Sequence, residues 1–343
     1  MKRNEKIDVI KGVAIILVVY GHALQYGAGE NVLKNALFFE DPIFKFIYSF
    51  HMPLFMLVTG YLFSFSLKKY SVPIIIKSRI YTLIVPICIW SLIPIVIKLV
   101  KGRGMSTVEI LKIYISTAIK ELWFLWAIFY CSLIVMIISK YMNDRIIIYI
   151  LVFVITFCVT DDKNISLYKY MYPFFVLGYY YGLHDNGIRL WWSRNKNKVF
   201  PVLIGIYGVM FFRFGYDSYI YTSGYCVLGK GDVWKQIVIN IYRLVIGCIG
   251  SFIIIGSIDI YYSLIDKKII KITAYLGRNS MGIYVFSGAI FNYVLPKITS
   301  NFGGINYITQ LMESAMIICF SLLFSWVIRR HKVLQQLFLG GRF

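Results

Sequence analysis

Residues 7–23 read IDVIKGVAIILVVYGHA, and this apolar run decides the class of fold. Similar runs recur along the whole chain of 343 residues, in which hydrophobic residues make up 59% and charged residues only 15%. A soluble domain is nearer half apolar and a quarter charged, because a folded surface needs polar cover. The composition therefore excludes a soluble enzyme, a disordered protein and a fibrous repeat, and it predicts an integral membrane protein.

The apolar runs divide the chain into about ten predicted spans, since a helix needs roughly 20 apolar residues to cross a hydrocarbon core. They lack the alternation of a transmembrane barrel, so we expect helices. The predicted fold is an all-α polytopic membrane protein in which residues 1–343 form a single domain. The predicted spans are 9–27, 42–65, 80–99, 121–139, 146–160, 167–184, 199–214, 236–258, 273–296 and 307–328.

The formal net charge of +20 is unevenly distributed between the two sides of these spans. If the N-terminus is cytoplasmic, the connections on that side carry 20 Lys and Arg residues and the opposite connections carry 11. This excess follows the positive-inside rule and predicts that both termini are cytoplasmic, so the charge needs no nucleic-acid partner. The connection 98–120 opposes the trend, which indicates either a basic external surface or a misplaced third span.

The six cysteines form no C-x-x-C pair and do not lie near a histidine at metal-ligand spacing. Most of them fall inside apolar runs, where cysteine behaves as a small buried hydrophobe. We therefore expect neither a metal site nor a disulfide framework.

Ionisable residues in the first predicted span are the leading functional candidates, because charged groups inside a bilayer are costly. Lys11 and His22 lie roughly 20° apart around a helix and about 16 Å apart along its axis. Asp8 lies on the same stripe. Two interpretations stay open: the three residues line a polar path into the membrane, or Asp8 and Lys11 mark the interface while His22 bonds a neighbouring helix.

A second candidate is His51, in the stretch FHMPLF at 50–55. Pro53 should loosen or kink the helix and free a carbonyl near position 49. Irregular backbone at membrane depth is tolerated where it lines a cavity. His51 therefore either contributes to a functional cavity or bonds the freed carbonyl in a packed kink.

Lys77 and Arg79 precede the apolar run 80–90, and their charges are suited to phosphate. They could hold a phosphorylated cofactor, or they could be ordinary positive-inside anchors. Four further ionisable residues are weaker candidates. A carboxylate at the depth of Glu313 could orient an imidazole, bind a sugar hydroxyl or pair with Arg243. The four weaker candidates are Glu121, Arg243, Arg278 and Glu313.

The segments that contain Lys11 and His22, His51, and Lys77 and Arg79 resemble the acyltransferase-3 family of bacterial integral membrane proteins, which most often O-acetylate cell-surface carbohydrates. The opening signature of the family is a basic residue, ten others and a histidine, here Lys11 and His22. The chain has Val285 where the family often has histidine, and Lys77 where arginine is common. Blocks similar to the later family motifs lie at 50–62, 77–86, 122–125 and 276–284.

The resemblance implies a ten-helix enzyme of the bacterial cytoplasmic membrane, without a metal. This enzyme would transfer an acetyl or other short acyl group from cytoplasmic acyl-CoA to a saccharide hydroxyl. It also implies site residues: the catalytic set is His22, Lys11 and Asp8, the donor-binding set is Lys11, His51, Lys77 and Arg79, and the acceptor-binding set is Glu313 and Arg243. The alternative from the intramembrane charges is a transporter or flippase for a lipid-linked sugar.

Overall fold

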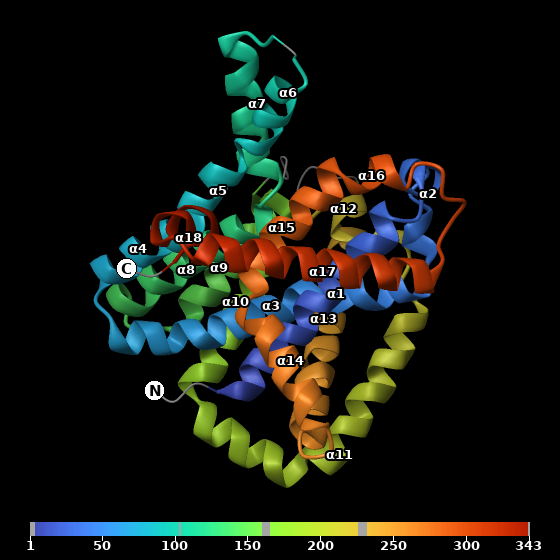
Figure 1. Ribbon diagram of the computed structural model, residues 1–343. Helices are drawn as coiled ribbons and strands as arrows, with labels where there is room; N and C mark the ends of the chain where they lie inside the picture. Colours follow the sequence, from blue (N-terminus) through green and yellow to red (C-terminus); the bar gives the residue numbers. More distant parts are fainter. Residues whose placement is uncertain (1–3, 103, 160–164, 226–231, 342–343) are drawn as a thin grey trace.

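The computed structural model describes residues 4–102, 104–159, 165–225 and 232–341. Within these ranges the regular structure is helical and contains no strand (Figure 1). Some residues used in the sequence predictions lie outside the described ranges. They are Lys2, Arg3, Arg103, Lys163, Lys230 and Arg342 of the charge count, and Cys226 among the cysteines.

Long helices make up most of the structure, and shorter ones connect them. The long helices are α1 (Glu5–Tyr26), α3 (Pro42–Lys69), α8 (Trp123–Tyr141), α10 (Ile165–Leu183), α11 (Asp185–Phe212), α13 (Val233–Tyr261) and α17 (Tyr307–Arg329). Two further segments are assembled from successive helices: α4 (Val72–Arg79), the π-helical η2 (Ile80–Ile84), α5 (Val85–Trp90) and α6 (Ile93–Val100); then α14 (Lys267–Arg278), α15 (Ser280–Tyr293) and α16 (Leu295–Ile298). The remaining elements are α2 (Glu30–Lys34), η1 (Leu37–Glu40), α7 (Thr107–Lys120), α9 (Ile146–Cys158), η3 (Tyr216–Ser218), α12 (Ile220–Ser223) and α18 (Lys332–Leu339).

Seven helices of the described residues are long and apolar enough to cross a membrane. They are α1, α3, the segment Val72–Val100, α8, α13, the segment Ser280–Ile298 and α17. The other three predicted spans overlap α9, α10 and α11, and α9 is a shorter apolar helix of 13 residues. The chain is thus a multi-pass, all-helical membrane protein. The third predicted span, 80–99, lies inside a longer helical segment that begins at Val72.

Helix α1 occupies the middle of the bundle and contacts α3, α13, α14, α15 and α17. Its closest approach is to α14: a Cβ at Gly12 would lie 2.0 Å from the carbonyl oxygen of Thr273. On the other side of the same contact, a Cβ at Gly277 would lie 1.8 Å from the carbonyl oxygen of Asp8. Small residues allow backbones to touch inside a membrane, where packing rather than water drives association. This contact fixes the helix that carries Asp8, Lys11 and His22.

Helix α3 continues without interruption through Pro53. His51 Nδ1 lies 2.8 Å from the carbonyl oxygen of Ile47, so the predicted bond to a carbonyl near position 49 is wrong. The reason is geometric, because side chains in a helix point back toward the preceding turn and reach the carbonyl four residues earlier.

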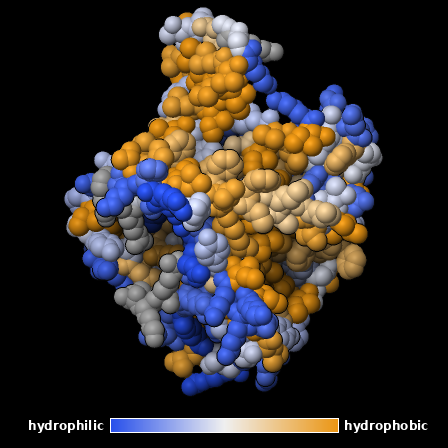
Figure 2. All heavy atoms as spheres, viewed as in Figure 1, coloured by the Kyte–Doolittle hydropathy of each residue, from blue (hydrophilic) through white to orange (hydrophobic). Residues whose placement is uncertain are grey.

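One part of the structure projects from the bundle. Helices α6 and α7 form a hairpin that rises above the other helices in Figure 1. Figure 2 shows hydrophobic side chains over much of the viewed face, including this hairpin, with hydrophilic residues gathered mainly toward the lower end and at the flanks.

Candidate active site

The two histidines predicted from the sequence lie in the same part of the bundle. His22 comes from α1 and His51 from α3, and their imidazoles are close enough to interact electrostatically. The His22 ring lies edge-on to Phe291 of α15, with 5.3 Å between ring centroids. His51 is only 3% exposed, and its Nδ1 lies against the Ile47 carbonyl. Because a carbonyl only accepts hydrogen bonds, Nδ1 carries the proton and Nε2 is left as an acceptor.

Tyrosines surround this pair and were not predicted. The ring of Tyr48 lies 4.7 Å from that of His51, and Tyr26 lies 6.0 Å from His22, between ring centroids. Tyr221 lies 6.3 Å from Tyr48 and interacts electrostatically with Tyr26. We call Tyr26, Tyr48 and Tyr221 the tyrosine cluster. The histidines are therefore in a mixed polar and aromatic interior, where hydroxyls can donate to a ligand.

Glu313 of α17 lies beside Gly27 at the end of α1. Gly27 follows His22 by little more than one helical turn. Glu313 is 6% exposed, and its Oε2 atom is buried without a hydrogen-bond partner in the described structure. Its position is tight, because a Cβ at Gly27 would lie 1.9 Å from this oxygen. A buried acceptor without a partner costs roughly 1–3 kcal/mol, more when it is charged. The oxygen is thus available to a ligand hydroxyl.

The end of α1 is held by the segment that leads into α17. Thr299 Oγ1 donates to the Tyr26 carbonyl at 3.1 Å, and Gln310 Nε2 donates to the Gly27 carbonyl at 3.3 Å. Gln310 is fully buried, and it lies one turn before Glu313 on the same helix. These bonds satisfy carbonyls that a helix end would leave open. They also fix Glu313 relative to His22.

Arg243 does not form the ion pair with Glu313 that was one of the predicted alternatives, as far as the described residues show. Its guanidinium donates to the carbonyl oxygens of Ser218 at 2.9 Å, Asp217 at 2.9 Å and Gly224 at 2.5 Å. Arg243 is 2% exposed, and burial of a guanidinium requires such a set of acceptors. It therefore ties down the segment that carries Tyr221. Its contact with an acceptor stays a prediction.

The opposite end of α1 carries the other predicted residues. Asp8 is buried, and its Oδ2 lies 4.0 Å from Nη1 of Arg278 at the end of α14. Lys11 follows one turn later and is half-buried. Lys77 and Arg79 lie on α4, which follows α3 in the chain. The Arg79 guanidinium lies 4.7 Å from the centre of the Phe63 ring.

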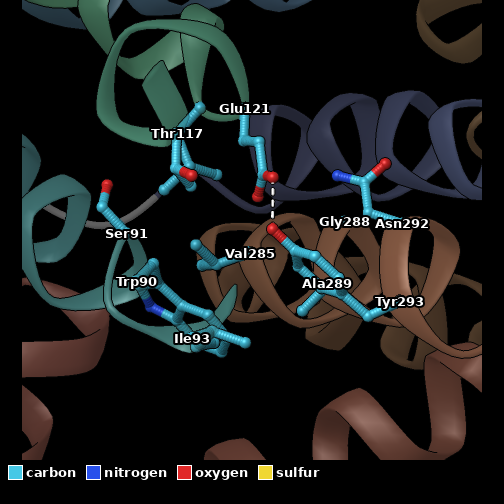
Figure 3. Close-up of a pocket in the computed structure, with 11 residues that line it drawn as sticks. Trp90, Ser91, Ile93, Thr117, Glu121, Val285, Gly288, Ala289, Asn292 and Tyr293 are labelled. Carbon is cyan, nitrogen blue, oxygen red and sulfur yellow. Dashed lines mark hydrogen bonds between the residues drawn. The ribbon is translucent and has the colours of Figure 1, made fainter. Parts of the chain in front are cut away.

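A small polar cavity opens near the far end of α1. It has a volume of about 20 Å³, room for about one water, and Figure 3 shows its lining. Tyr293 Oη donates to the Glu121 carboxylate across it. Burial raises the pKa of the Glu121 carboxyl, while hydrogen bonds from Tyr293 and Asn292 oppose the rise. Glu121 also interacts electrostatically with Tyr26, which links the cavity to His22.

Polar groups thus run from Asp8 and Arg278 at one end, through the two histidines, to Glu313 and Glu121 at the other. The sequence predicted most of these residues, but not the tyrosine cluster or the contact between Asp8 and Arg278. Among the residues that the structure describes, no group of three or more His, Cys, Asp or Glu side chains is placed to hold a metal ion. The arrangement can accept a proton at an imidazole and bind hydroxyls and anions on opposite sides of it.

Comparison with known proteins identifies one matching family and two similar proteins. The family described as acyltransferase domain matches residues 4–330. The chain is 26% identical over 297 residues to nodulation protein NolL of Mesorhizobium japonicum, covering 84% of this chain and 77% of that protein. It is 26% identical over 294 residues to nodulation protein NolL of Sinorhizobium fredii, covering 84% and 78%. No solved structure matches.

Proposed function

Because the chain belongs to the acyltransferase domain family, we propose that this enzyme transfers an acetyl group from acetyl-CoA to a hydroxyl of a cell-envelope saccharide. The observation that carries the proposal is that His22 and His51 lie in one region of the bundle, beside an end of α1 where a buried carboxylate oxygen of Glu313 has no partner among the described residues. The family match favours this enzyme over a transporter or flippase for a lipid-linked sugar.

We infer that residues 1–343 form a single domain that crosses the bacterial cytoplasmic membrane ten times, with both termini in the cytoplasm. The seven long apolar helices account for seven crossings, and α9, α10 and α11 supply the other three. The excess of Lys and Arg on the N-terminal side supports this orientation. It places Asp8 and Lys11 at the cytoplasmic face and Glu313 toward the outer face.

The donor would approach from the cytoplasmic end. Lys11, Lys77 and Arg79 offer positive charge to the phosphates of CoA, and guanidinium groups are suited to bind phosphate in a bidentate manner. Asp8 orients this mouth through its contact with Arg278. Since His22 lies about 16 Å beyond Lys11 along α1, an extended pantetheine arm can bring the thioester to the imidazole.

His22 would act as the general base. Its imidazole takes the proton of the acceptor hydroxyl while the oxygen attacks the thioester carbonyl. Collapse of the tetrahedral intermediate breaks the carbon–sulfur bond, and the CoA thiolate leaves and takes up that proton. His51 helps to hold the donor because its Nε2 can accept a hydrogen bond from an amide N–H of the pantetheine arm. Glu313 Oε2 accepts a hydrogen bond from another hydroxyl of the saccharide. Arg243 supports the acceptor site indirectly, because its bonds to backbone carbonyls hold the segment that carries Tyr221.

Transfer of radiolabelled acetyl from acetyl-CoA to envelope polysaccharide, with the protein in lipid nanodiscs, tests the proposal. His22→Ala should lower the rate by about 100-fold or more, the scale of a lost general base. His331→Ala is a matched control, because this histidine is exposed and lies after α17. A folded His22→Ala protein that transfers acetyl at the wild-type rate would remove His22 from the mechanism.

Donor binding can be measured separately. Acetyl-CoA should raise the thermal unfolding temperature of the wild type, and Arg79→Ala should weaken this stabilisation. No stabilisation in either protein would contradict the proposed donor site.

A further inference from the structure

The α6–α7 hairpin, residues 93–120, projects from the main core (Figure 1), while its base, with Ile93 and Thr117, lines the small cavity beside Glu121. Its base is fixed to the bundle: Trp126 Nε1 donates to the Ala118 carbonyl at 2.8 Å, and Tyr168 Oη donates to the Ile119 carbonyl at 3.2 Å. Closer to the tip, Lys98 and Glu109 approach within 3.6 Å across the two helices. The hairpin is therefore an ordered projection with a defined surface.

That surface is apolar along one side. On α7, Val108 is 62% exposed, Leu111 57% and Ile115 48%, and their spacing of three and four places them on one stripe. On α6, Val96 and Val100 are exposed with the same spacing. Figure 2 shows the hairpin as a largely hydrophobic projection. A contiguous exposed apolar patch marks a surface that is covered in the working protein.

A polar, basic stripe runs beside the apolar one on α7. Its members are Glu109, Lys112, Ser116 and Lys120, centred roughly 110° around the helix from the apolar stripe. Lys98 on α6 and Lys101, directly after α6, add positive charge on the other arm of the hairpin. An apolar stripe flanked by lysines is typical of a helix that lies in the membrane interface, with the lysines at anionic headgroups.

The hairpin is also at the right depth for this. Counted from Arg79 at the proposed cytoplasmic mouth, Ile80–Val100 is about 31 Å long, close to the hydrocarbon thickness of about 30 Å. The end of α6 and the turn into α7 therefore reach the level of the lipid headgroups. The apolar stripe then continues a surface that already faces lipid.

We propose that the α6–α7 hairpin is a membrane-surface element that binds anionic phospholipid. Its apolar stripe enters the boundary of the acyl chains, and Lys112 and the neighbouring lysines contact lipid phosphates. This also accounts for the basic connection 98–120, which opposes the positive-inside trend. These lysines serve lipid binding rather than topology.

Hydrogen exchange of hairpin amides tests the proposal in nanodiscs of POPC alone and of POPC with a quarter POPG. A lysine near an anionic surface contributes about 1 kcal/mol, so POPG should slow exchange near the tip by about fivefold or more. Lys112→Gln should remove about fivefold of that slowing. Lys297→Gln, an exposed lysine on α16, is the matched control and should leave it unchanged.

Two results would overturn the proposal. Equal exchange in POPC, in POPC with POPG and in amphipol would show that lipid does not cover the hairpin. Protection that grows with protein concentration in amphipol would assign the apolar stripe to a second copy of the chain instead. The thermal unfolding temperature of Lys112→Gln, compared with that of the wild type, checks that the hairpin base is intact.

Discussion

The substitution Glu313→Gln should change the stability of the protein and its binding of the acceptor in opposite directions. Oε2 of Glu313 is buried without a partner and is pressed against Gly27, so the folded protein bears the cost of desolvating a carboxylate. Glutamine has the same shape without the charge, and we expect the free energy of unfolding to rise by about 1 kcal/mol. If Glu313 accepts a saccharide hydroxyl, the loss of charge should also weaken that bond by about 1 kcal/mol, or about fivefold in kcat/KM. Stability and transfer should therefore move in opposite directions.

The assay measures thermal unfolding and acetyl transfer on the same nanodisc preparation. Glu30→Gln is the control, because Glu30 is exposed near the same end and pairs with Lys34 on the surface, where ion pairs contribute little. A Glu313→Gln protein that is less stable than the wild type but transfers acetyl equally well would refute the reasoning. In that case the carboxylate would be a structural group rather than a ligand for the acceptor.

Three further predictions concern packing and charge. Gly12→Ala should destabilise the protein by about 1–3 kcal/mol, since its Cβ would meet the Thr273 backbone, whereas Gly205→Ala on α11, with nothing within 4 Å, should not; equal unfolding temperatures would contradict the α1–α14 contact. Arg243→Lys should cost about 2 kcal/mol or more in chemical denaturation, because an ammonium cannot replace the fork that reaches several carbonyls, and an unchanged denaturation midpoint would contradict its structural role. The raised pKa of Glu121 means that the folded state favours the protonated form, so its contribution to stability is full below the ordinary carboxyl pKa and is lost as pH rises through the folded pKa; Glu121→Gln should remove this pH dependence of the unfolding temperature, and a constant difference from the wild type across pH would disprove it.

The sequence predicted the helices well, for one physical reason. In a bilayer, backbone groups must bond within each segment, so apolar length alone places α1, α3 and the others. The same cost of burying charge singled out His22 and Glu313 before any contact was known.

The partners of these residues could not be predicted, because they come from distant segments. Arg278 approaches Asp8 only because Gly12 and Gly277 let two backbones touch, and no local pattern encodes that contact. Tyr221 was hidden among 28 tyrosines without a repeating spacing. The partners of Arg243 were equally hidden: its guanidinium donates to backbone carbonyls of a distant irregular segment, which no local pattern indicates.

The two ends of the candidate site differ in whether the buried carboxylate has a partner. At the Asp8 end of the site, the buried carboxylate has a cationic neighbour, Arg278. At the other end, Glu313 keeps a buried oxygen without a partner among the described residues. Under the proposed function, a saccharide hydroxyl reaches this oxygen only if the packing around Glu313 opens. This asymmetry predicts that the donor binds to the free enzyme, and that the hydroxyl of the acceptor completes the site by satisfying the oxygen that the fold leaves open.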